Sequence, residues 1–290
     1  MAEDAEIITR VGVRRRVTLR VVLRSFQVLS WFAVYLAVLT LALGPFLWIW
    51  CRLFDHRRSL PRKLVRMFYR QGMRGFCGRN MRIVPFDWSA ISGPCIMVAN
   101  HQSVIDILLM MQLPPDARCW SKDWPFHRPL LGWLMALCGH LHVDDPDVMN
   151  QAMDGIRQGV SMYIFAEGTR SRTHRLGRFH DGAFQLACAA HVPVVPVVIH
   201  GSGDCMPPGQ IAVFDVPIVV EPLGMLYADE SLPHPHRELK RRAHAMIAAA
   251  LENGPGGNKP IETGPVSTAG AAASARNMRE VNVPQGITHG

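Results

Sequence analysis

The chain has 290 residues, which is enough for one substantial domain with additional segments but too short for two full enzyme domains. Hydrophobic residues make up 49% of it, a value typical of globular proteins, so any membrane segment is expected to be local. The net charge of +8 is uneven, because residues 1–80 hold 15 basic and 4 acidic residues whereas the remainder is slightly acidic. This distribution favours an anionic lipid surface as partner, and we find no nucleic-acid-binding motif.

The first 80 residues are organised around one apolar run. Residues 1–24 form a basic segment, and residues 25–51 carry no charge. We predict a transmembrane or membrane-embedded helix or hairpin over 25–51, because about 20 apolar residues are enough to cross a bilayer core. Gly44-Pro45 interrupts the run, so a kinked span and a hairpin both stay open. Arginines flank both ends, and this symmetry favours a hairpin with both flanks in the cytoplasm.

Residues 52–80 form a second basic segment. Within it, the pattern over 61–74 predicts an amphipathic helix in which apolar residues alternate with arginines and a lysine. Such a helix can lie in the headgroup layer of a membrane. The alternative is a basic face on a helix that packs against the domain.

From residue 81 the pattern becomes that of an α/β fold with a largely parallel central sheet flanked by helices. Strands are predicted over 95–99, 117–121, 140–143, 161–166 and 194–200, with one or two more within 211–220. Helices are predicted over 103–112, 129–138, 148–158, 182–190 and 236–251. The domain is expected to cover residues 81–252. Residues 253–290 are rich in Gly, Pro, Ala, Ser and Thr and are predicted to be disordered.

The seven cysteines, at positions 51, 77, 95, 119, 138, 188 and 205, form no recognisable pattern. An odd number of scattered cysteines without a C-x-x-C pair argues against a disulfide framework or a zinc site, and fits a reducing compartment. We expect small buried side chains at these positions and no metal site.

The segment Asn100–Asp106 places a histidine and an aspartate after a predicted strand. Active residues gather at the carboxyl ends of strands in doubly wound sheets. On one regular helix, His101 and Asp106 would lie on different faces. They can meet if His101 stands in the loop and Asp106 projects back from the first helical turn, where the carboxylate would orient the imidazole as a general base. The alternative is that Ser103 and Asp106 only cap the helix.

A second polar cluster, Phe165–Arg172, follows the strand predicted over 161–166. It contains a carboxylate, a flexible glycine, hydroxyl groups and two guanidinium groups. Arginine forks suit phosphate oxygens, and glycine lets the backbone approach an anion closely. The alternative is a polar surface turn. Because both clusters follow strands of the same predicted sheet, they could line one cleft.

Three sequence blocks resemble the glycerolipid acyltransferases related to 1-acyl-glycerol-3-phosphate acyltransferase. The family's first block, N-H-x-x-x-x-D, matches Asn100, His101 and Asp106. The third block, F-P-E-G-T-R-S, matches residues 165–171, with Ala166 in place of the proline. The fourth, V-P-[IV]-[VI]-P-V, matches residues 192–197. The resemblance covers roughly residues 80–225, and three short motifs in the right order form a far more specific signal than one.

The second family block, G-x-x-F-[IV]-x-R, is altered in this chain. Residues 139–145 read Gly-His-Leu-His-Val-Asp-Asp, so Asp145 occupies the position of an arginine that the family uses toward the acceptor's phosphate. Lys122 matches a family lysine implicated in phosphate binding. His140 and His142 could contribute donors, although core or surface positions are the simpler interpretation. The acceptor is therefore 1-acylglycerol-3-phosphate or a lysolipid with a different headgroup.

The resemblance implies an enzyme that transfers a fatty acyl group from acyl-CoA or acyl carrier protein to a lysophospholipid hydroxyl, first of all that of 1-acyl-sn-glycerol-3-phosphate, to give phosphatidic acid. It implies His101 as general base, held by Asp106. The residues implied in substrate binding are Lys122, Glu167, Gly168, Thr169 and Arg170. It implies no cofactor beyond the acyl co-substrate, no metal, and a location at the inner cell membrane with the catalytic domain facing the cytoplasm.

Two other functions stay open. A lipid hydrolase is suggested by His200–Asp204, but this segment departs from G-x-S-x-G and its glycines are typical of a turn. A non-catalytic lipid-binding protein would use the basic amphipathic segment and would not need His101.

Overall fold

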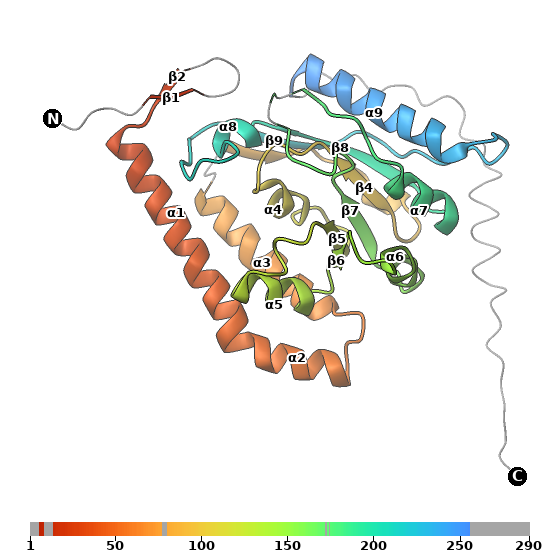
Figure 1. Cartoon of the computed structure of the whole chain (residues 1–290), viewed down its shortest axis with the longest axis horizontal. Helices are drawn as coiled ribbons and strands as arrows, with labels where there is room; N and C mark the ends of the chain where they lie inside the picture. Colours follow the sequence, from red (N-terminus) through yellow and green to blue (C-terminus); the bar gives the residue numbers. More distant parts are fainter. Residues whose placement is uncertain (1–5, 9–13, 77–79, 172, 174, 256–290) are drawn as a thin grey trace, which may run out of the picture. The chain divides into compact units, whose positions relative to one another are not determined.

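The computed structural model describes residues 6–8, 14–76, 80–171, 173 and 175–255. These residues belong to one compact unit. From position 256 onward the predicted tail lies outside the described residues, so its disorder stays a prediction. A short antiparallel pair of strands, β1 (Glu6–Ile8) and β2 (Arg14–Arg16), precedes the first helix (Figure 1).

A seven-stranded sheet forms the centre of the unit, in the order β3-β9-β8-β4-β7-β5-β6. Its strands are β3 (Met81–Ile83), β4 (Ile96–Ala99), β5 (Ala117–Ser121), β6 (Leu141–His142), β7 (Ser161–Ile164), β8 (Val194–His200) and β9 (Ile218–Pro222). All neighbouring strands are parallel except β8 and β9. The predicted fold class, a largely parallel sheet flanked by helices, is confirmed.

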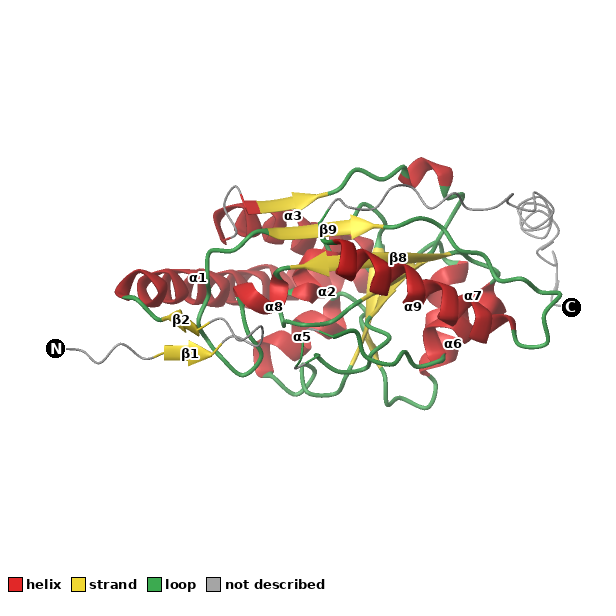
Figure 2. Cartoon of the chain, turned by 90° about the horizontal axis from the view of Figure 1, so that it is seen from above, coloured by secondary structure: helices red, strands yellow, loops and turns green. Residues whose placement is uncertain are grey.

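Each face of the sheet contributes to its own hydrophobic core. In β4, Met97 and Ala99 face one cluster whereas Ile96 and Val98 face the other, as the two-residue period of a strand requires. Helices α6 (Val148–Arg157), α7 (Gly182–Ala190) and α9 (Pro235–Asn253) cover the second face, and α9 runs along β8 (Figure 2). Because both faces are covered, the four residues of β4 and of β7 are all buried.

On the first face lie α4 (Asp106–Met110) and α5 (Pro129–Leu137), together with the N-terminal helices (Figure 1). A helical run of 35 residues, Leu19–Leu53, consists of α1 (Leu19–Ala37), a π-helical turn (Val38–Leu43) and α2 (Gly44–Leu53). Its mean hydropathy reaches 2.1, and by length and composition it could cross a membrane. The run bends where the π turn meets Gly44-Pro45, and α2 then passes beneath α5 (Figure 1).

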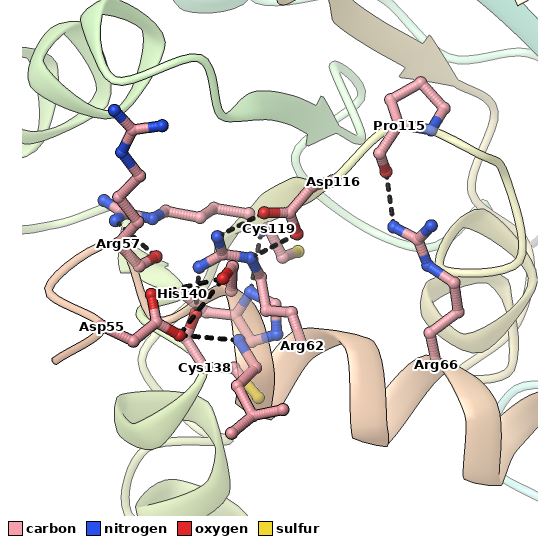
Figure 3. Close-up of polar contacts among 12 residues, drawn as sticks. Asp55, Arg57, Arg62, Arg66, Pro115, Asp116, Cys119, Cys138 and His140 are labelled. Atoms are coloured by element: carbon pink, nitrogen blue, oxygen red, sulfur yellow. Dashed lines mark hydrogen bonds and ion pairs between the residues drawn. The ribbon is translucent and has the colours of Figure 1, made fainter. Parts of the chain in front are cut away.

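Helix α3 (Ser59–Phe76) contains the predicted amphipathic helix and is fixed to the domain. Val65 and Tyr69 are buried, and so is the Arg62 side chain, which is only 2% exposed. Arg62 forms a bidentate ion pair with Asp116, with Nε and Nη2 at 2.8 and 2.7 Å from the carboxylate oxygens (Figure 3).

A second arginine of α3 is also used within the domain. Arg66 donates hydrogen bonds to the carbonyl oxygens of Pro114 and Pro115, and the bond to Pro115 is drawn in Figure 3. Arg62 and Arg66 therefore agree with the interpretation of α3 as a helix that packs against the domain. Lys63, Met67 and Arg70 on the same helix are exposed.

Of the one or two strands predicted within 211–220, the structure has one, β9, which begins only at Ile218. Before it, the backbone N–H groups of Val213 and Phe214 donate to Ser25 Oγ in α1 and to the Cys205 carbonyl rather than to a neighbouring strand. Other local predictions need correction. Helix α4 is shorter than predicted. A short helix, α8 (Ser202–Cys205), occupies the expected turn. The edge strand β3 and a 3-10 turn (Trp88–Ala90) were not predicted.

Candidate active site

His101 and Asp106 are in direct contact at the carboxyl end of β4. His101 Nδ1 lies 2.9 Å from Asp106 Oδ2; the imidazole is 14% exposed and the aspartate is fully buried. The same oxygen accepts hydrogen bonds from the main-chain N–H groups of Gln102 and Ser103. Asp106 therefore bonds to the turn before α4 and to the imidazole at the same time, and its role in orienting a base stays a prediction. The carboxylate fixes Nδ1 as the protonated nitrogen, which leaves Nε2 able to accept a proton.

Glu167 connects the second motif to the first. It is buried, and its Oε1 accepts a hydrogen bond from the His101 main-chain N–H at 2.9 Å. Its Oε2 accepts a hydrogen bond from the Gly177 N–H at 2.8 Å, and the Ser171 N–H donates to the His101 carbonyl at 2.7 Å. The two motifs thus hold the His101 main chain from both sides. Burial raises the pKa of Glu167, although these backbone hydrogen bonds and His101 counteract part of that effect.

The strand order explains why residues so distant in sequence converge. Strands β4, β7 and β5 are adjacent and parallel, and Val98, Ile164 and Trp120 lie at the same level. His101 comes three residues after Val98, and Glu167 comes three residues after Ile164. Lys122 comes two residues after Trp120. All three therefore emerge at one edge of the sheet, where the ends of parallel strands meet.

The remaining predicted residues occupy the open side of this edge. Gly168 has a φ of +64°, a conformation that glycine adopts without strain, and a Cβ there would lie 3.0 Å from the His180 ring. Thr169, Arg170 and Lys122 are exposed. Among the described residues, neither the Arg170 guanidinium nor the Lys122 ammonium has a hydrogen-bonding or ion-pairing partner, so both are free to meet an anion.

Several positioning residues were not recognised as such from the sequence. The Phe165 ring stacks on the His101 imidazole with centroids 4.1 Å apart. Asn100 exchanges two hydrogen bonds with the backbone of Ile199, which ties the end of β4 to β8. Ser103 Oγ donates to the Met206 carbonyl at 2.7 Å. The family block signals Phe165 and Asn100, but only the fold reveals their partners.

The altered second block has a structural role. Asp145 accepts hydrogen bonds from the Asp147 N–H and from Gln151 Nε2 at the start of α6, so it stabilises a helix end. His142 Nε2 lies 2.7 Å from Asp123 Oδ1. His140 is buried in the core, in agreement with the simpler interpretation.

An apolar cavity of about 330 Å³ opens between α1, α3, α4 and α5. Its lining includes Val104 and Met206, next to the loop that carries His101, and reaches Cys138 and His140 between α5 and β6. The position suits an alkyl chain whose reactive end lies at His101.

The segment that suggested a lipid hydrolase offers no activated nucleophile. Ser202, the serine of the hydrolase-like segment, is fully buried, and its Oγ has no hydrogen-bond partner among the described residues, so no base activates it there. Within the described ranges, no group of three or more His, Cys, Asp or Glu side chains is arranged to hold a metal ion.

Sequence comparison places similar proteins among lipid acyltransferases. A family model described as acyltransferase matches residues 65–200. The chain is 31% identical over 206 residues to a chloroplastic 1-acyl-sn-glycerol-3-phosphate acyltransferase of Brassica napus, covering 65% of this chain and 56% of the relative. It is 32% identical over 170 residues to the 1-acyl-sn-glycerol-3-phosphate acyltransferase of Saccharomyces cerevisiae, covering 55% of each. The chain thus spans about half the length of these relatives.

Structural comparison finds the 1-acyl-sn-glycerophosphate acyltransferase of Thermotoga maritima. The TM-score is 0.65 and the sequence identity 20%, and the match covers 81% of this chain and 96% of that one. At this identity, the similarity establishes a shared fold.

Proposed function

We propose that the chain is a glycerolipid acyltransferase, which transfers a fatty acyl group from acyl-CoA or acyl carrier protein to the hydroxyl of 1-acyl-sn-glycerol-3-phosphate, forming phosphatidic acid. The observation that carries the proposal is the His101–Asp106 pair, held by Glu167 at the open edge of the sheet. The names of the similar enzymes support this choice of acceptor.

In this mechanism, His101 Nε2 removes the proton from the acceptor hydroxyl while Asp106 stabilises the imidazolium. The alkoxide attacks the thioester carbonyl, and a C–O bond forms. The tetrahedral intermediate then collapses, the C–S bond breaks, and the thiolate takes the proton back from His101. No redox cofactor or metal takes part, because the thioester is already activated.

The acceptor's phosphate is assigned to the exposed cations of the site. Arg170 offers a planar fork of donors and Lys122 a compact charge, and both follow strands that end at the edge of the sheet that also carries His101 and Glu167. Thr169 and the backbone at Gly168 complete the binding loop. Glu167 uses both of its carboxylate oxygens on the backbone, so we assign it to positioning His101 rather than to contacting substrate.

The fatty acyl chain is assigned to the apolar cavity beside His101, which would shield it from water. The membrane location is assigned to the helical run Leu19–Leu53, which exposes large apolar side chains on α1, the π-helical turn and α2. The exposed side chains are Leu19, Val22, Leu23, Phe26, Val34, Val38, Leu41, Phe46, Trp48, Ile49, Trp50 and Leu53. We place the protein at the inner cell membrane with the catalytic domain in the cytoplasm, which fits the basic residues on both sides of this helix.

The test is a transfer assay with the purified full-length chain. Labelled acyl-CoA or acyl carrier protein is offered with a panel of lysolipids, and the His101→Ala variant serves as control. We expect donor-dependent acylation of 1-acyl-sn-glycerol-3-phosphate that His101→Ala abolishes, while binding of the variant to vesicles is retained. Release of free fatty acid without a donor would favour a hydrolase, and activity retained in His101→Ala would exclude the mechanism.

A second acceptor class is favoured by one observation. The arginine of the second block is replaced by Asp145, whose carboxylate accepts hydrogen bonds from the Asp147 N–H and from Gln151 at the start of α6. If the panel shows acylation of another lysolipid and none of 1-acyl-sn-glycerol-3-phosphate, the reaction class stands and the acceptor assignment fails.

A further inference from the structure

The apolar cavity has a polar end. His140, between α5 and β6, and Tyr69, on α3, both line it, and both are more than nine-tenths buried. Tyr69 is held in place by stacking on Phe32 of α1, and His140 by edge contact with Tyr163 of β7. Two hydrogen-bonding side chains are therefore fixed in the wall of a cavity otherwise lined mainly by apolar groups.

The protonation state of His140 follows from its partner. The Cys119 main-chain N–H donates to His140 Nδ1 at 2.9 Å, so Nδ1 must carry a lone pair. Figure 3 shows the two residues. Burial, together with Arg62 and Arg118, lowers the pKa of His140 to about 3, so the ring is neutral at physiological pH. A neutral ring with an unprotonated Nδ1 carries its proton on Nε2.

Among the described residues, the structure gives no hydrogen-bond partner to His140 Nε2–H or to the Tyr69 hydroxyl. Neither atom is among the unpaired polar atoms that are closed off from solvent, so each keeps accessible surface, which the cavity provides. A polar group that loses its water to a ligand without gaining a partner is costly, and such groups commonly bond to the ligand or keep a water. Together they offer a donor and a hydroxyl that both donates and accepts, which is the complement of an alcohol or carbonyl oxygen.

The polar end lies far from the reacting atoms. Cys119 is level with Tyr163 of β7 and therefore with Met97 of β4. His101 follows Met97 by four residues, which corresponds to about 13 Å along the strand direction, and His140 lies two strands away from β4. A group at His140 would belong to the distal part of an acyl chain whose thioester is at His101.

We infer that the cavity selects an acyl chain carrying an oxygen substituent, such as a hydroxyl, toward its ω end, which accepts a hydrogen bond from His140 Nε2–H and bonds to the Tyr69 hydroxyl. This rests on the proposed function for the location of the thioester. It deepens that function by naming the class of acyl donor. A plain alkyl chain would leave both groups unsatisfied.

The experiment compares three acyl-CoA donors of equal chain length with the full-length enzyme in nanodiscs: saturated, hydroxylated at the ω carbon, and hydroxylated next to the thioester. We expect kcat/KM for the ω-hydroxyl donor to exceed that of the saturated donor by about three- to tenfold, the range that one hydrogen bond provides. His140→Phe and Tyr69→Phe should reduce this ratio toward one. His140→Gln keeps an acceptor for Cys119 and a donor for the ligand, and should retain most of it.

The ratio of kcat/KM for the ω-hydroxyl donor to that for the saturated donor is measured within one preparation. It is therefore insensitive to partial loss of folded protein. Equal rates with the two donors in the wild type, or a preference that persists in His140→Phe, would overturn the inference. A preference for the hydroxyl next to the thioester would overturn it as well.

A binding measurement separates this inference from the proposed function. The corresponding free fatty acids are titrated into His101→Ala, and the fluorescence of Trp31 and Trp124, which line the cavity, is followed. Tighter binding of the ω-hydroxy acid supports the inference even if no transfer is found, whereas equal binding contradicts it.

Discussion

The main-chain N–H of His101 donates a 2.9 Å hydrogen bond to the buried carboxylate of Glu167. The other carboxylate oxygen is held by the Gly177 N–H, and a Cβ at Gly177 would lie 2.7 Å from that oxygen. The position of the histidine is therefore set by a residue 66 positions away in sequence, and the loop around Gly177 leaves no space for a larger side chain.

We predict that Glu167→Gln lowers kcat while leaving KM for the acceptor nearly unchanged. An amide has one acceptor oxygen, so one of the two backbone N–H groups loses its partner and His101 shifts. A displacement of this kind is expected to cost about 10- to 100-fold in rate. A rise in acceptor KM at constant kcat would instead indicate that Glu167 binds substrate directly, as the sequence analysis expected.

Asp106→Asn tests the orientation of the base. The asparagine oxygen can still accept hydrogen bonds from the Gln102 and Ser103 N–H groups, so the loop should keep its shape. The neutral amide, however, no longer stabilises an imidazolium at His101. We expect kcat to fall by about 100-fold or more, with an unfolding transition close to that of the wild type. Near wild-type turnover in this variant would contradict the role assigned to the pair.

The fold was predictable where local signals agree with the sheet. The bounds of β5, α7 and β8 match the prediction, because apolar runs there are separated by glycine, proline and polar residues. The stretch 211–217 forms no strand although it is rich in apolar residues. The Val213 N–H donates to Ser25 Oγ in α1, and a contact with a residue 188 positions away leaves no periodic signal in the sequence.

The site was predictable as a set of residue types rather than as a geometry. The order of the blocks identifies His101 and Glu167. That the two residues touch follows from the strand order β4-β7-β5, and no pattern in the sequence predicts that strand order. Similarly, the charge pattern of α3 does not distinguish exposed Lys63 from buried Arg62. Only the position of Asp116, on a loop far along the chain, makes that difference.

We predict that Arg62→Met destabilises the protein strongly. Arg62 is almost fully buried and also donates to the Cys138 carbonyl at 3.0 Å. Its loss leaves the Asp116 carboxylate and that carbonyl without their partner, and removing one member of a buried pair costs about 3 kcal/mol in the free energy of unfolding. Thermal unfolding of the purified protein, followed by circular dichroism, measures the effect.

The control for Arg62→Met is the double variant Arg62→Met/Asp116→Asn. It removes the unpaired charge, so its loss of stability should be smaller than the sum of the two single effects. Strictly additive losses would show that the two side chains do not interact in solution.

The pH dependence of stability tests the environment of His140. Its pKa is about 3 in the folded chain against 6.5 for an unperturbed histidine, so the unfolded state binds the proton first. The folded state should therefore lose stability as the pH falls from 6.5 toward 3, by about 5 kcal/mol at most over the whole range. Above pH 6.5 the ring is neutral in both states, and this contribution does not vary.

His140→Gln isolates this contribution. Glutamine does not titrate and can accept the Cys119 hydrogen bond, so the variant should be flatter than the wild type as the pH falls from about 7 to about 5, where most carboxylates remain ionised. Unfolding midpoints in denaturant, measured at several pH values in this window, provide the comparison. If stability falls equally with pH in the wild type and in His140→Gln, His140 is hydrated in solution. The inference that a neutral ring donates from Nε2 into the cavity would then be wrong.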